Sequence, residues 1–149
     1  METIIANLNG YLHSLRRLSG NKCDFWADVI KIEVDFEKTI EGFISKFKNN
    51  VKLIEKKEIS YFEVESLLEE LLLSNLDISS KDLKKSFTWD IIEYYGLAST
   101  DTDPDGEFNP LVSNGAIQIT VQSDFHKSCV YYIVAISNHA VVTGLAERA

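Results

Sequence analysis

The chain has 149 residues, of which 45% are hydrophobic and 26% are charged, and these values are usual for a globular protein with a substantial core. Its 23 acidic and 15 basic residues give a formal net charge of −8, so we do not expect it to bind nucleic acid or an anionic membrane. No apolar run approaches the roughly 18 residues that cross a bilayer, and residues 1–7 lack the pattern of a signal peptide. We therefore expect a cytoplasmic protein.

Apolar residues recur at helical spacing at the start of the chain, which predicts a first helix over residues 2–18. Ser19 and Gly20 follow it, and Gly is common just beyond a helix C-terminus. The predicted buried face carries Ile4, Ile5, Leu8, Leu12, Leu15 and Leu18.

Residues 24–47 carry the strongest pattern, and we predict one long helix there. Steps of three and four residues return its apolar side chains to a single face. A strand is the alternative for part of this segment, because residues 30–36 alternate between apolar and charged side chains. The helix is favoured because it accounts for more of the apolar positions. It could extend to residue 57 or break at Asn49 and Asn50. The apolar face consists of Phe25, Val29, Ile32, Phe36, Ile40, Phe43 and Phe47.

Two further helices are predicted from capping patterns. Ser60 and Glu63 have the spacing of a capping box ahead of an apolar run, which predicts a helix over residues 61–74. Ser79 and Asp82 repeat that spacing, and the fourth helix is expected to end at Gly96.

Beyond the helices, residues 97–115 are rich in Asp, Pro, Gly, Asn and Ser, which indicates an acidic loop. Residues 116–149 then show strand patterns separated by short links, with a bulge possible at Gly144. The predicted fold is α+β within a single domain. It consists of an N-terminal bundle of about four helices (residues 1–96), the acidic loop (97–115) and a three-stranded antiparallel β-meander (116–149).

The acidic loop contains the sharpest local motif. Asp101, Asp103 and Asp105 alternate ahead of Gly106, as at the start of an EF-hand calcium loop. The match ends there, because Val112 stands where the bidentate Glu belongs. We expect an exposed turn and no metal site.

The sequence shows no other pattern of residues that is typical of a catalytic or metal site. His126 and His139 are expected at opposite ends of the middle strand of the meander, too far apart to share a metal. The sequence has no phosphate-binding loop, no nucleophile elbow and no zinc-protease motif. We therefore predict a non-enzymatic protein without a cofactor.

Acidic and aromatic residues are the best candidates for a binding surface. Glu33, Glu37 and Glu41 recur at helical spacing and could form an acidic stripe. Tyr94 and Tyr95 precede the acidic loop, where one ring could anchor a partner and the other is expected in the core. The carboxylates nominated in the loop are those of Asp101, Asp103, Asp105 and Glu107.

In its size, acidity, mixed fold and lack of catalytic motifs, the chain resembles small acidic bacterial toxin-immunity proteins. The resemblance implies a cytoplasmic protein whose acidic surface occludes the basic cleft of a cognate toxin, often a nuclease. A secretion-type chaperone or adaptor is an alternative, although its familiar fold interleaves strands with helices, whereas here the helices are expected first. An enzyme of unrecognised family is the third possibility.

Overall fold

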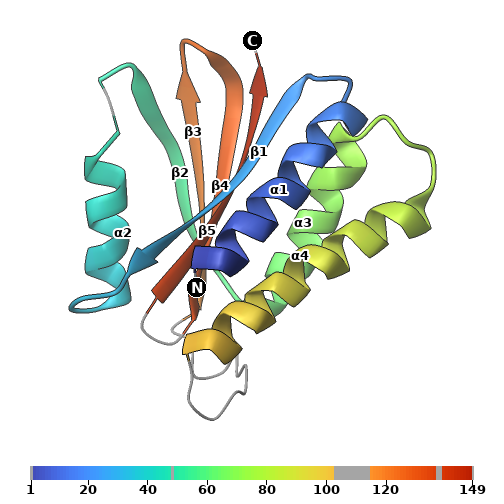
Figure 1. Ribbon diagram of the computed structural model, residues 1–149. Helices are drawn as coiled ribbons and strands as arrows, with labels where there is room; N and C mark the ends of the chain where they lie inside the picture. Colours follow the sequence, from blue (N-terminus) through green and yellow to red (C-terminus); the bar gives the residue numbers. More distant parts are fainter. Residues whose placement is uncertain (1, 48, 103–114, 137–138, 149) are drawn as a thin grey trace.

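The computed structural model describes residues 2–47, 49–102, 115–136 and 139–148 (Figure 1). Within these residues the chain forms four helices and five strands, and the two kinds of element alternate in the first half of the chain. In chain order they are α1 (Glu2–Leu18), β1 (Cys23–Lys31), α2 (Phe36–Ser45), β2 (Val51–Ile59), α3 (Tyr61–Asn75), α4 (Lys81–Thr102), β3 (Ala116–Ser123), β4 (His126–Ile136) and β5 (His139–Arg148).

All five strands belong to one antiparallel sheet with the order β1-β5-β4-β3-β2. The three C-terminal strands form the expected meander, with β4 in the middle of the sheet. The two N-terminal strands lie at its edges, where β1 pairs with β5 and β2 pairs with β3.

The predicted fold is therefore correct in its α+β class but wrong in its architecture. The sheet has five strands where three were expected, because β1 and β2 come from the part of the chain that was predicted to be helical. Helices and strands are interleaved, so the expected helical bundle preceding the sheet does not exist.

The single helix predicted over residues 24–47 is the source of this error. Its first part is β1, and only Phe36–Ser45 is helical. Both faces of β1 carry apolar side chains: Phe25 and Ala27 pack on one side of the sheet, and Trp26 and Ile30 on the other. Phe25 and Val29 of this strand also fit the three- and four-residue spacing that continues into α2, so the strand was predicted as part of one helix. The helix does not continue to residue 57: it ends at Ser45, before the alternative break at residues 49–50, and β2 begins at Val51.

The helices cover both faces of the sheet. Helices α1, α3 and α4 lie against one face, and α2 lies against the other (Figure 1). Strand β4 supplies both cores in alternation, since Val134 and Ile136 pack under the three helices while Ile133 and Ala135 pack under α2. On α2, Phe36 and Ile40 are the buried residues.

Side chains from α1 and its C-terminal turn, together with one from β1 itself, occupy the outer edge of β1. The amide of Asn9 pairs with both backbone groups of Ala27, donating to its carbonyl at 2.8 Å and accepting from its N–H at 2.7 Å. The N–H of Cys23 donates to Ser19 Oγ, and the N–H of Val29 donates to the Asp28 carboxylate. These bonds satisfy groups that would otherwise invite another strand to pair with this edge.

Gly144 of β5 makes room for an aromatic side chain and is not a bulge. The register of β5 with both β1 and β4 is continuous at this residue. The indole of Trp26 lies so close over Gly144 that an added Cβ would stand 2.5 Å from a ring carbon. Across Gly144, Trp26 meets Tyr131 edge-on with ring centroids 5.5 Å apart.

Of the last two helices, α3 follows the predicted capping chemistry and α4 departs from it at both ends. Ser60 caps α3 by accepting from the N–H of Glu63, as expected. Helix α4 begins one residue later than predicted, with Ser80 accepting from the N–H of Leu83. It also runs through Gly96 to Thr102, because a glycine costs a helix only about 1 kcal/mol.

Two glycine substitutions should change stability in opposite directions. Gly144→Ala should lower the free energy of unfolding by about 1–3 kcal/mol, because its methyl group collides with Trp26. Gly42→Ala, on α2, should raise it by about 0.5–1 kcal/mol, because open space surrounds that position in a helix. Both values can be measured by denaturant melts.

The close approach of Trp26 is tested by a double substitution. Trp26→Leu should make Gly144→Ala less costly than in the parent protein, since the two residues are in contact. Equal costs of Gly144→Ala in the two backgrounds would contradict the assigned role of this glycine.

Candidate protein-interaction site

Only two of the three residues of the expected acidic stripe lie on a helix. Glu37 and Glu41 lie four residues apart on the exposed side of α2. Glu33 is exposed too, but it lies in the turn between β1 and α2 and is not helical. The stripe was predicted on a helix that does not extend to Glu33.

Glu33 lies in basic surroundings. It lines a groove of about 430 Å³ between the end of β1 and α2, where lysines outnumber acidic residues. This groove therefore does not suit a basic partner. Its walls are formed by Ile30, Lys31, Glu33, Val34, Lys38, Thr39, Gly42, Phe43 and Lys46.

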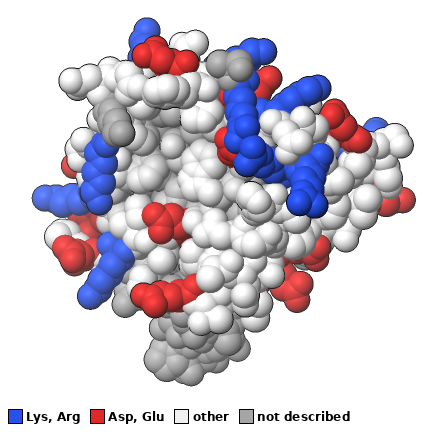
Figure 2. Space-filling model, turned by 45° about the horizontal axis from the view of Figure 1, so that its top comes forward, with Lys and Arg blue, Asp and Glu red and all other residues white. Residues whose placement is uncertain are grey.

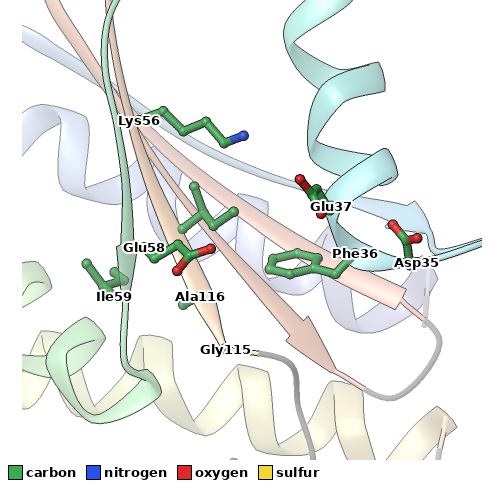
Figure 3. A pocket seen from close by; sticks show the side chains of 9 residues that line it. Asp35, Phe36, Glu37, Lys56, Glu58, Ile59, Gly115 and Ala116 are labelled. Atoms are coloured by element: carbon green, nitrogen blue, oxygen red, sulfur yellow. The ribbon is translucent and has the colours of Figure 1, made fainter.

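Glu37 lines a larger groove, of about 580 Å³, between the start of α2 and the edge strand β2 (Figure 3). Phe36 from α2 and Glu58 from β2 point toward each other across it. Two of its three carboxylates have a structural role or a lysine on the same strand. Asp35 caps α2 by accepting from the N–H of Lys38 at 2.8 Å, and Lys56 lies two residues from Glu58 on β2. The remaining walls are Ile59, Gly115, Ala116 and Ile117.

The two nominated tyrosines have different environments. Tyr95 is fully buried, and its hydroxyl bonds to Thr143 Oγ1 on β5 at 2.7 Å. It therefore belongs to the core and is not accessible to a partner. Tyr94 is half-buried and lines a groove between α1 and α4. Asp101 falls in the last turn of α4, and Asp103, Asp105 and Glu107 lie outside the described residues.

The groove between α1 and α4 has the composition expected of an acidic, aromatic binding surface. It measures about 260 Å³ and is lined by Tyr11, Asp90, Glu93, Tyr94 and Leu97. We refer to these five residues as the α1–α4 groove. The two tyrosine rings lie with centroids 6.1 Å apart and are tilted by 51°.

A hydrogen bond links the two helices at the groove. The Tyr11 hydroxyl donates to Asp90 Oδ2 at 2.8 Å across 79 residues of sequence. Burial, with the hydrogen bond and the negative charge of Asp90, raises the pKa of Tyr11 well above its usual value. The phenol thus stays protonated and holds the carboxylate in place.

Apolar side chains extend this surface along α4. Trp89 is 54% exposed and Leu97 is 48% exposed. Trp89 and Glu93 are four residues apart on the helix, so they lie on the same side of it. The outer side of α4 therefore combines an exposed indole and an exposed leucine with carboxylates.

Among the described residues, the carboxylates of the groove form no ion pair. In the described part of the chain the ion pairs are those of Asp24 with Arg16 and Arg148, and none involves Asp90 or Glu93. No Lys or Arg occupies the positions three or four residues from either acid on α4. Their negative charge is available to a ligand, in contrast to that of Asp24, where the guanidinium of Arg148 lowers the pKa of the carboxyl.

The excess of acidic residues does not form one continuous patch on the face shown in Figure 2. Acidic and basic side chains are interspersed there, and a group of basic side chains gathers at the upper right. On this face the net charge therefore does not define a single acidic surface.

Sequence reasoning identified Tyr94 but missed Tyr11, Asp90 and Glu93. Tyr11 is one turn from the buried residues Leu8 and Leu15 of α1, so the helical pattern places it at the border of the buried face. An aromatic residue with a polar tip at such a border was the available signal. Its pairing with α4 depends on how the helices pack, which the sequence does not state.

Comparisons with known proteins add no further assignment: no family model, no curated protein and no solved structure matches the chain.

Two physical findings bear on other kinds of site. Among the described residues, no three His, Cys, Asp or Glu side chains are grouped so that they could hold a metal ion. None of the described helices is both long and apolar enough to cross a lipid bilayer.

Replacing Asp90 by Asn should lower the pKa of Tyr11. The amide can still accept the hydroxyl, but it no longer places a negative charge beside the phenol. The pKa should fall toward, but not reach, the usual value of about 10, because burial is the largest cause of its elevation. Nuclear magnetic resonance of ring-labelled tyrosine measures it directly.

Tyr131 is the internal control for that titration, because burial and Cys129 raise its pKa on the other side of the sheet. Its titration should be unchanged in the Asp90→Asn variant. An unchanged pKa for Tyr11 would show that the bond to Asp90 is not made in solution.

Proposed function

We propose that this protein is a non-enzymatic binding protein and that the α1–α4 groove takes a basic protein partner. The proposal rests on one observation. A single groove contains two half-buried tyrosine rings and two carboxylates that form no ion pair with the described residues. Exposed aromatic anchors surrounded by complementary charge are typical of the residues that dominate protein interfaces.

The net charge supports the choice of a basic partner. A charge of −8 attracts a basic protein at long range and speeds encounter, while the groove and the exposed Trp89 supply short-range contact. The groove is also favoured over the one beside β2, where Asp35 caps α2, Lys56 lies two residues from Glu58 and the aromatic ring of Phe36 is part of the core.

Among binding proteins, we propose an immunity protein that neutralises a cognate toxin by covering its basic cleft. A small acidic chain with an aromatic and acidic surface suits that role, since a toxin that acts on nucleic acid has a cleft of the opposite charge.

A secretion-type chaperone or adaptor is the second candidate. The order of elements now favours it more than the sequence did, because strands and helices are interleaved through β2. Such a protein would bind an unfolded segment of its client, whereas an immunity protein would bind a folded domain.

The test begins with a pull-down from the source cell, using the parent protein and its Glu93→Lys and Glu41→Lys variants as baits. A partner retained by the parent protein should be basic, and it should be depleted on Glu93→Lys but kept on Glu41→Lys. Glu41 is the matched control, since it is an exposed carboxylate on α2, away from the groove.

Surface plasmon resonance with the purified partner then separates the two contributions. Glu93→Lys should slow association by roughly threefold to tenfold at low salt, with a smaller effect at high salt. Tyr94→Ala should speed dissociation by about tenfold, because it removes a buried contact. Association that does not respond to salt or to Glu93→Lys, or a partner that is acidic, would contradict the proposal.

The immunity role has its own readout. Expression of the partner alone should arrest growth, and co-expression of the parent protein should restore it. Co-expression of Glu93→Lys should restore growth less well than co-expression of Glu41→Lys. A partner that is harmless alone and binds only as an unfolded segment would favour the chaperone.

A further inference from the structure

The α1–α4 groove is small enough for one side chain. Its volume of about 260 Å³ is below the roughly 300–1,000 Å³ usual for sites that hold drug-sized ligands. Its long walls are helices, and Tyr11 and Tyr94 bring their rings together from the two sides. An occupant must therefore be slender and must tolerate aromatic surfaces.

The chemistry of the walls selects a cation. The faces of tyrosine rings attract positive charge, most strongly when water is partly excluded. Asp90 already accepts the Tyr11 hydroxyl through Oδ2, which leaves Oδ1 without a donor among the described residues. Glu93 is exposed at the rim and forms no ion pair with the described residues. The walls thus offer two ring surfaces and at least two carboxylate oxygens.

We propose that the α1–α4 groove binds the guanidinium group of an arginine side chain presented by the basic partner. A guanidinium is planar, stacks on aromatic rings and carries five donors, so it can lie against Tyr94 while it bonds to Asp90 and Glu93. An ammonium is compact and strongly hydrated, and it would use the rings less well. This inference deepens the proposed function and rests on it.

Exposed apolar residues strengthen the site. Leu97 belongs to the groove, and Trp89 lies one turn from Glu93 on the same side of α4. Once a partner covers them they exclude water from the ion pair, and charged contacts are stronger where water is excluded.

The test is a titration of the whole protein with N-acetyl-arginine amide, followed by nuclear magnetic resonance. The ring signals of Tyr11 and Tyr94 should shift and saturate. The corresponding citrulline compound, which has the same shape without the charge, should produce no saturable shift. The lysine compound should bind more weakly than the arginine compound.

Two variants and a control locate the site. Glu93→Gln, at an exposed position, should weaken arginine binding about fivefold without changing the fold. Tyr94→Leu should remove the saturable shift of Tyr11 while the chain stays folded by circular dichroism. Glu41→Gln, on α2, should leave the binding unchanged.

Equal shifts with arginine and citrulline, tighter binding of lysine, or arginine binding that Glu93→Gln and Tyr94→Leu do not alter would each overturn the inference. Its failure is distinguishable from that of the proposed function. If Glu93→Lys weakens the partner complex but the arginine compound does not bind, the arginine assignment fails and the protein-binding function stands. If the arginine compound binds but Glu93→Lys does not change partner association, the proposed protein-binding function is contradicted and the arginine site in the groove is supported.

Discussion

Strands β4 and β5 are apolar on both faces, and both faces of the sheet must therefore be removed from water. Along β5 every residue from Ala140 to Ala146 is buried, and β4 is buried on both sides from Tyr132 to Ile136. Three helices meet this requirement on one face and α2 meets it on the other. The groove between α1 and α4 lies at the border of this covered face, where Tyr11 and Tyr94 are half-buried and partly open to solvent.

The open edges of the sheet explain the positions of the first two strands. The β3–β4–β5 meander alone would leave two open edges, and β1 and β2 cover them. The edge formed by β1 is occupied by the side chains of Ser19, Asn9 and Asp28. The edge formed by β2 carries mostly charged side chains between Val51 and Ile59 and contains an irregularity between Leu53 and Glu55, both of which discourage pairing with another strand.

Most helices and the C-terminal strands could be predicted from the sequence because their patterns are local. The spacing of Leu8, Leu12 and Leu15 on α1 and the Ser60 cap of α3 specify structure without reference to the rest of the chain. Strands β1 and β2 could not be predicted in this way. Burial does alternate along β1, but its apolar residues also fit helical spacing, and β2 is exposed along nearly its whole length, so β2 shows no apolar face.

Of the residues that line the candidate site, only Tyr94 was nominated from the sequence. The sequence indicated an aromatic anchor beside the carboxylates of the acidic loop, whereas the carboxylates that line the groove with Tyr94 are those of Asp90 and Glu93 on α4. The second ring, Tyr11, comes from the other end of the chain and depends on the packing of α1 against α4. Glu33, in contrast, was nominated from a helical spacing that does not exist, and it lies among lysines.

Hydrogen–deuterium exchange on the partner complex tests the central claim most directly, because it reports on every part of the surface at once. Partner binding should slow exchange in Glu2–Leu18 and Lys81–Thr102, the helices that form the groove, and should leave Phe36–Ser45 unchanged. Slower exchange confined to α2 and β2 would show that the partner binds on the opposite side of the sheet and would contradict the account.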